Sequence, residues 1–193
     1  MTLSRYVLRA TLVATALAGG ITSASAYMID PITREPIVAQ PSRARGSAIP
    51  REIIDYQTEH RAGTIVVNTT ERRLYLVMAD GKALRYGIGV GRDGFQWGGA
   101  HSISMKREWP DWRPPAAMLK RQPDLPRHMP GGPQNPLGAR ALYLGSSIYR
   151  IHGSNKPWTI GTAVSSGCFR MTNEDVADLY ERVNVGTRVV VMR

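Results

Sequence analysis

Short runs of β-branched and apolar residues, each closed by turn residues, constrain the fold of this chain more than any other feature. Seven such runs occupy residues 64–68, 73–78, 83–90, 101–106, 141–144, 147–152 and 187–192. Runs of this length and composition are typical of strands. Asp80-Gly81 is a hairpin turn signal between the second and third runs. The pattern predicts a mainly β domain, either a sandwich or a barrel.

One stretch near the end of the chain has helical periodicity. Four apolar residues from Val176 to Val183 recur at i, i+3, i+4 and i+7, which places them on one helix face. Thr172 or Asn173 can cap the N-terminus, and Gly186 follows as a stop signal. The sequence therefore predicts one short helix, packed on the β domain.

The chain divides into three segments. Residues 1–26 resemble a secretory signal, with Arg5 and Arg9 before an apolar stretch and Ala24-Ser25-Ala26 as a cleavage site. Residues 27–62 contain several prolines and arginines and are expected to form an arm or linker. Residues 63–193 form the folded domain. We expect export to the periplasm or cell envelope; an uncleaved, weak membrane anchor is the alternative.

The chain is basic, with a formal net charge of +10 at pH 7. This charge is compatible with attraction to an anionic wall polymer, or simply with a solvated basic surface. The sequence contains no run of five basic residues and no nucleic-acid-binding motif. We therefore expect no nucleic-acid partner.

Cys168 is the only cysteine. Exported proteins usually pair their cysteines in disulfides, and a lone cysteine has no intramolecular partner. It is therefore either buried and inert or a reactive thiol. Its position between Gly167 and a run that contains Arg170 favours the reactive thiol.

His152 lies sixteen residues before Cys168, in a strand-like run. A neighbouring imidazole can take the thiol proton, and the Gly153 carbonyl can fix its tautomer through Nδ1. Backbone N–H groups near Ser166 and Gly167 are candidates for an oxyanion hole. The alternatives are a structural histidine and serines that only cap the loop.

Several further residues are candidates for substrate binding. Arg170 can bind a substrate carboxylate or form a surface ion pair. Residues 108–136 are rich in proline, and a long ordered loop of this kind is often a lid. Trp109 and Trp112 in this loop, and Tyr149 before His152, are expected to contact the substrate.

We expect neither a metal ion nor an organic cofactor. The four histidines are far apart in sequence, and none has zinc-ligand spacing with another histidine or with the cysteine. The glycines of Gly87-x-Gly89-x-Gly91 are not predicted to open a helix, which argues against a dinucleotide-binding turn.

The segment Ile151-His152-Gly153, followed by Ser165-Ser166-Gly167-Cys168-Phe169-Arg170-Met171, resembles the catalytic domain of L,D-transpeptidases, also called the YkuD domain. The resemblance covers about residues 63–193 and implies a mixed β-sandwich of this type. It implies that Cys168 attacks the L,D-peptide bond of a peptidoglycan tetrapeptide stem and that His152 is the base. D-Alanine leaves, and an amine from a second stem or an envelope protein resolves the thioester.

The chain departs from the family pattern at two places. Ser166 stands where the commoner motif has histidine, which leaves the role of base to His152. Residues 97–101 replace a Thr-Pro-x-Gly turn. Two other functions stay open: an L,D-carboxypeptidase, which resolves the thioester with water, and a non-catalytic wall-binding module.

Overall fold

The computed structural model describes residues 28–29, 36–37 and 49–193. The predicted signal segment and half of the predicted arm lie outside the described residues. Two short strands in the arm, β1 (Met28–Ile29) and β2 (Pro36–Ile37), pair in antiparallel fashion. In the described part of the chain, no helix is long and apolar enough to cross a membrane.

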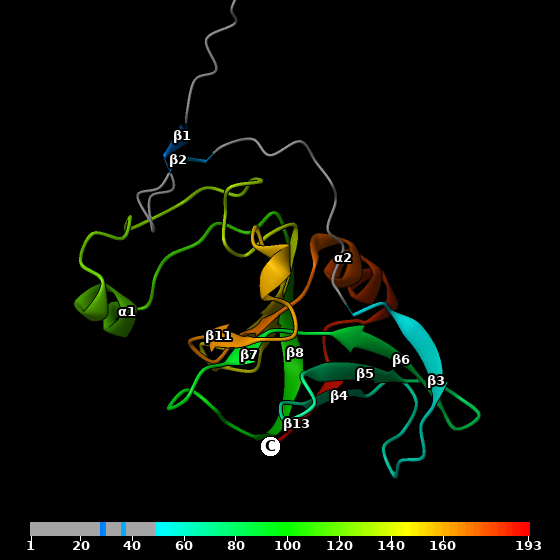
Figure 1. Ribbon diagram of the computed structural model, residues 1–193. Coiled ribbons are helices and arrows are strands. Elements are labelled where there is room, and N and C mark those ends of the chain that lie inside the picture. Colours follow the sequence, from blue (N-terminus) through cyan, green and yellow to red (C-terminus); the bar gives the residue numbers. More distant parts are fainter. Residues whose placement is uncertain (1–27, 30–35, 38–48) are drawn as a thin grey trace, which may run out of the picture.

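A nine-stranded mixed sheet forms the body of the protein (Figure 1). Its spatial order is β12-β10-β9-β8-β13-β4-β5-β6-β3. The strands are β3 (Glu52–Asp55), β4 (Ile65–Asn68), β5 (Arg73–Val77), β6 (Lys82–Gly87), β8 (Gly99–Glu108), β9 (Arg140–Leu144), β10 (Arg150–His152), β12 (Phe169–Arg170) and β13 (Arg188–Met192). Two shorter strands, β7 (Val90–Gly91) and β11 (Ala163–Ser165), pair in parallel beside it.

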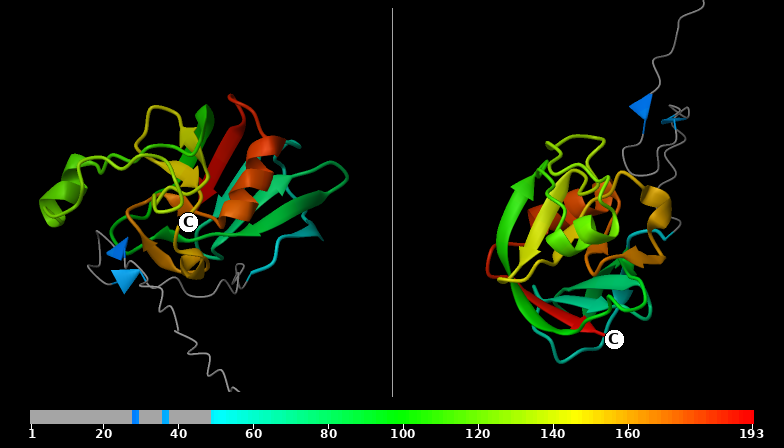
Figure 2. Two further views of the ribbon diagram at one scale, coloured as in Figure 1. Left: turned by 90° about the horizontal axis from the view of Figure 1, so that it is seen from above. Right: turned by 90° about the vertical axis from the view of Figure 1, so that its left-hand side faces the viewer.

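The long strand β8 joins the two halves of the sheet. Its first part pairs with β13 and its second part with β9, and the register shifts between Ile103 and Met105. Such irregularities increase the local bend of a strand. Figure 2 shows this curved green strand running through both halves. The sheet therefore wraps around a common interior.

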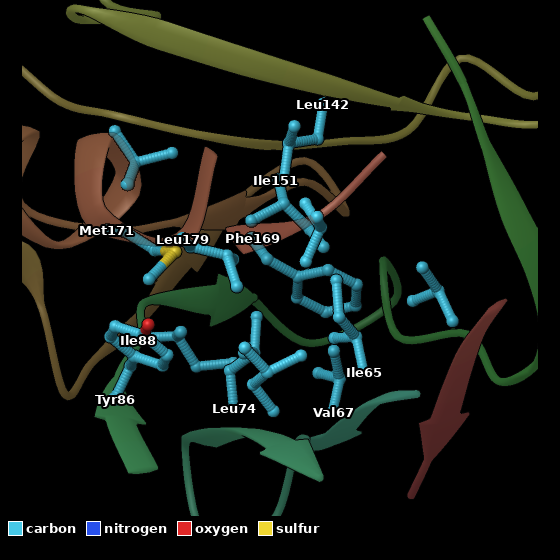
Figure 3. Packing of buried hydrophobic residues seen from close by; sticks show 14 of the residues in the cluster. Ile65, Val67, Leu74, Tyr86, Ile88, Leu142, Ile151, Phe169, Met171 and Leu179 are labelled. Carbon is cyan, nitrogen blue, oxygen red and sulfur yellow. The ribbon is translucent and has the colours of Figure 1, made fainter. Parts of the chain in front are cut away.

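Apolar side chains from both halves of the sheet fill that interior. Ile65 and Leu74 come from one half, and Ile151 and Phe169 come from the other; each is at most 1% exposed (Figure 3). The helix α2 (Asn173–Arg182) closes the core against β9 and β10. Burial of this single apolar cluster is the main term that stabilises the fold.

The predicted helix is confirmed as α2. The Thr172 hydroxyl oxygen accepts a hydrogen bond of 3.0 Å from the Asp175 N–H and caps the helix. Val176 and Leu179 on the predicted apolar face are fully buried. The prediction of a mainly β fold with one main helix is therefore confirmed.

The structure also contains short elements beside the predicted strands and helix. The helices α1 (Ala116–Arg121) and η1 (Pro157–Thr159) are short. Strand β3 lies within the segment predicted as an arm and pairs with β6 at the sheet edge. Its carboxylates Glu52 and Asp55 form ion pairs with Arg85 and Lys82. Ile54 between them packs against a small apolar cluster of Val66, Tyr75, Val77 and Ala83.

Candidate active site

Strands β10 and β12 lie side by side, and their register places side chains of the two strands together on the core face and on the opposite face. The strands are parallel, with Ile151 opposite Phe169 and His152 opposite Arg170. Ile151 and Phe169 point into the core. Because side chains alternate along a strand, Arg150, His152 and Arg170 face the opposite side. That face forms the floor of a cavity.

The cavity has a volume of about 450 Å³ and two chemically different walls. Polar residues from the sheet side form one wall: Arg92, Arg150, His152, Ser165, Ser166, Cys168 and Arg170. Mostly apolar residues from the 112–137 loop form the other: Trp112, Pro115, Met118, Arg121, Gln122, Leu125, Pro136 and Leu137. Ile148 and Val164 complete the lining. None of the described residues that line the cavity is Asp or Glu.

His152 is held in one tautomer. Its ring is 4% exposed, and Nδ1 lies 2.6 Å from the carbonyl oxygen of Gly153. A carbonyl oxygen only accepts hydrogen bonds, so Nδ1 carries the proton and Nε2 keeps its lone pair. Burial, assisted by the charge of Arg170, lowers the pKa of His152 to about 3. The imidazole is therefore neutral near pH 7 and can accept a proton.

Cys168 shares this cavity with His152. Its Sγ atom lies 4.0 Å from the carbonyl oxygen of Ile148. Burial raises the pKa of the Cys168 thiol, while the nearby Arg150 and Arg170 act in the opposite direction. Together with the neutral imidazole, the raised pKa of Cys168 favours a neutral thiol at rest over a thiolate–imidazolium pair.

Gly167 makes the turn that presents Cys168. Its φ is +107°, and a Cβ atom here would lie 2.5 Å from Cε1 of Tyr149. The Gly167 N–H donates to the Ser165 hydroxyl (3.1 Å), which in turn donates to the Cys168 carbonyl (2.6 Å). The Gly167 N–H is therefore occupied, and the N–H groups of Ser166 and Cys168 are the remaining candidates for an oxyanion hole.

Tyr149 supports this turn from below rather than lining the cavity. Its ring stacks on Trp97, with centroids 4.3 Å apart and an interplanar angle of 9°. The Trp97 indole N–H donates to the Gly167 carbonyl oxygen at 2.7 Å. Tyr149, expected to contact the substrate, does not line the cavity but is placed to position Cys168. Trp97 was not predicted to be part of the site.

Asn173 supports the loops around His152. Its Oδ1 accepts hydrogen bonds from the N–H groups of Ala139 (2.9 Å) and Ser154 (3.2 Å). A Cβ atom on Gly153 would lie 2.3 Å from the same oxygen. This close approach explains why glycine follows the histidine. The sequence predicts only a helix cap at Asn173. No local pattern indicates that its side chain holds two distant loops together.

The two tryptophans predicted in the lid lie in different environments. Trp112 is 7% exposed, packs with Leu125 and Leu137, and lines the cavity. Trp109 is 44% exposed and does not line it. The structure therefore brings only Trp112 to the candidate site, and the expected substrate contact of Trp109 is not supported.

Arg170 lines the cavity as expected for a residue that binds a substrate carboxylate. Its Nε is buried, with no hydrogen-bond partner among the described residues. Three further arginines of the lining, Arg92, Arg121 and Arg150, were not identified from sequence. Arg150 could have been, since it is two residues before His152 on a strand and so shares its face.

The YkuD family model, described as an L,D-transpeptidase catalytic domain, matches residues 62–191. The probable L,D-transpeptidase ErfK/SrfK of Escherichia coli K12 is 37% identical over 153 residues, or 75% of this chain and 48% of the relative. YbiS from the same strain is 39% identical over 150 residues, or 73% and 47%. The chain spans about half the length of these curated relatives.

Two solved structures have related folds. L,D-Transpeptidase 3 of Mycobacterium tuberculosis aligns with a TM-score of 0.54 and 16% identity, covering 67% of this chain and 60% of that one. This likeness confirms the predicted fold type. A Brucella melitensis protein described as a probable carnitine operon oxidoreductase is 46% identical (TM-score 0.52; 77% and 97% covered). In this chain, however, Gly91 leads into a turn at residues 92–95, not into a dinucleotide-binding helix.

Proposed function

The chain belongs to the YkuD family of L,D-transpeptidase catalytic domains, and from this membership we propose that it is a cysteine-dependent acyltransferase acting on peptidoglycan stems. One observation carries the proposal: Cys168 and His152 line the same cavity, and Nδ1 of the imidazole is committed to the Gly153 carbonyl. This arrangement leaves Nε2 as the base for the only thiol in the chain.

In the first half-reaction, Nε2 of His152 takes the thiol proton as Sγ of Cys168 attacks the carbonyl carbon of the L,D-peptide bond. Arg150 and Arg170 favour the thiolate and disfavour the imidazolium, because their charges lower the pKa of both groups. The imidazolium therefore passes its proton readily to the amine of the leaving D-alanine. A thioester remains on Cys168.

In the second half-reaction, an acceptor amine attacks the thioester. His152 takes a proton from that amine and returns it to the departing Cys168 sulfur, which regenerates the thiol. Each tetrahedral intermediate carries an oxyanion, for which the N–H groups of Ser166 and Cys168 are the candidate donors. Arg170 is proposed to hold a carboxylate of the donor stem.

The proposed acceptor is an amine of a second stem or of an envelope protein, and the proposed location is the periplasm or cell envelope. The signal-like residues 1–26 support export. The basic net charge of +10 supports attraction to an anionic wall.

Intact-mass spectrometry tests the reaction. Protein without residues 1–26 is incubated with a tetrapeptide stem, and wild type is compared with Cys168→Ala. We expect a thioester adduct, with loss of D-alanine, on wild type alone. Addition of a candidate amine should release a cross-linked product, whereas release only by water would identify a carboxypeptidase. No adduct on wild type would support the wall-binding module instead.

Reaction with a β-lactam gives a second readout. L,D-Transpeptidase 3 of M. tuberculosis has been solved with a faropenem-derived adduct. We propose that a penem or carbapenem acylates Cys168 here as well. The expected mass increase should be absent in Cys168→Ala and strongly slowed in His152→Gln, because the latter has no base for the thiol.

A further inference from the structure

The cavity gathers positive charge without a matching carboxylate. Four arginines line it: Arg92 after β7, Arg121 at the end of α1, Arg150 on β10 and Arg170 on β12. Burial lowers the pKa of Arg170, and Arg92 adds to this shift. Buried charges in proteins are normally paired, so a ligand that supplies negative charge is expected beside Arg170. Arg92 is half-buried and Arg121 is exposed, so both can reach a ligand in the cavity.

Two of these arginines meet on one aromatic ring. The guanidinium carbon of Arg92 lies 4.3 Å from the centroid of the Phe95 ring, and that of Arg121 lies 4.9 Å from it. Arg92 is part of the turn that follows β7, and Arg121 is on the loop that covers the cavity. The Phe95 ring therefore contacts one guanidinium from the body of the protein and one from the 108–136 loop, and both add positive charge to this side of the cavity.

The two arginines differ in their other contacts. Arg92 Nη1 lies 3.3 Å from the Ser166 hydroxyl oxygen and 3.4 Å from the Ser165 carbonyl oxygen. Arg121 makes no hydrogen bond or ion pair with the described residues. Its guanidinium donors are thus available to a ligand. Because Ser166 is two residues before Cys168, this pair adjoins the reacting centre.

We propose that Arg92 and Arg121 form a second anion subsite, which binds an internal carboxylate of the donor peptide. This inference rests on the proposed function. Arg170 lies beside the nucleophile on β12, whereas the new subsite spans the body and the lid. A carboxylate bound at this subsite accepts charge-assisted hydrogen bonds from a guanidinium of the body and from one at the end of α1.

The chemistry of the remaining walls favours a peptide carboxylate. Trp112, Met118 and Leu125 give the lid side of the cavity an apolar surface, which suits the aliphatic parts of a peptide. The volume of about 450 Å³ accommodates a few residues. The subsite therefore distinguishes stems with free internal carboxylates from stems in which these groups are amidated.

Calorimetric binding to the Cys168→Ala protein tests the subsite without acylation. The probes are a tetrapeptide stem with free internal carboxylates and the same stem with those groups amidated. We expect Arg121→Gln to weaken binding of the acid stem about tenfold or more and to leave the amidated stem unchanged. Arg121→Lys should recover part of the loss.

Lys120→Gln is the matched control, because Lys120 precedes Arg121 on the same helix but does not line the cavity. Equal losses for both stems in Arg121→Gln, or no loss for either, would overturn the subsite. Failure of the proposed function gives a different result. Binding of the acid stem would then still depend on Arg121, but wild-type protein would form no thioester.

Discussion

The indole N–H of Trp97 donates a hydrogen bond of 2.7 Å to the carbonyl oxygen of Gly167, the residue before Cys168. The same indole stacks on Tyr149, whose ring occupies the space beneath Gly167 where a Cβ atom would otherwise lie. The turn that presents Cys168 is therefore held by two aromatic rings. The position of the thiol depends on residues outside the cavity lining.

Trp97→Phe should slow acylation while leaving the fold intact. Phenylalanine keeps much of the ring stacking but leaves the Gly167 carbonyl without its donor, which costs about 1–2 kcal/mol. We expect acylation of Cys168 by a stem peptide to fall about tenfold, because small displacements of a nucleophile are costly. Trp158→Phe is the control, since Trp158 is 67% exposed. Equal rates in the two variants would contradict the role of Trp97.

Gly153→Ala should destabilise the protein through Asn173. The added Cβ would lie 2.3 Å from Asn173 Oδ1 and 3.0 Å from the Ala139 nitrogen, so the loops must move apart. Such overpacking typically costs about 1–3 kcal/mol. Urea unfolding should show this loss, and alkylation of Cys168 by iodoacetamide should slow, because the hydrogen bond that orients His152 moves with Gly153.

A double-mutant cycle separates this clash from a general loss of stability. Asn173→Ala removes the oxygen that the new Cβ meets, although it also leaves two N–H groups without an acceptor. The double variant should therefore lose less stability than the two single variants lose together. Additive losses would show that the two positions do not interact.

The local parts of the site were predictable from sequence, and the long-range parts were not. His152 lies between Ile151 and Gly153 at the end of one strand. Ile151 is apolar and enters the core, so His152 faces the other side, and the carbonyl oxygen of Gly153 binds its ring. The orientation of His152 could therefore be predicted from its two neighbours. The parallel pairing of β10 with β12 depends on a strand of only two residues, whose register is set by Phe169 entering the core. No periodicity can reveal so short a strand.

The supporting residues are distant in sequence from the groups they hold. Trp97 precedes Gly167 by 70 residues, and its role depends on how β8 brings the two halves of the sheet together. In the sequence, residues 97–101 stand out only because they replace the Thr-Pro-x-Gly turn of the family. The fold class was predictable because strand-forming runs and one helical stripe are local patterns; the Trp97 contact is a consequence of packing.

His152 should make stability depend on pH. Its pKa is about 3 in the native state and about 6.5 in the unfolded chain. Between these values the unfolded state binds a proton that the native state does not bind, so stability falls as pH decreases from about 6.5 towards 3. The slope from this group approaches about 1.4 kcal/mol per pH unit.

Urea unfolding at pH 7.5, 5.5 and 4.5 measures this dependence. His152→Gln removes the titrating group, while the carboxylates that also titrate at low pH are common to both proteins. The free energy of unfolding of wild type should therefore fall more steeply with decreasing pH than that of the variant. Parallel slopes would mean that His152 is not held neutral.

The 108–136 loop offers a comparison between two tryptophans three residues apart. Trp112 is 7% exposed, packs with Leu125 and Leu137, and lines the cavity, whereas Trp109 is 44% exposed and does not. Trp112→Ala removes the apolar centre of this loop, at a cost of about 3–5 kcal/mol in local packing for a buried tryptophan.

Without Trp112 the loop should cover the donor poorly, and acylation of Cys168 by a stem peptide should fall about tenfold or more. Trp109→Ala should acylate at nearly the wild-type rate. Alkylation by iodoacetamide, which needs no lid, should be similar in both variants, and equal acylation by the stem would show that the 108–136 loop does not hold the substrate.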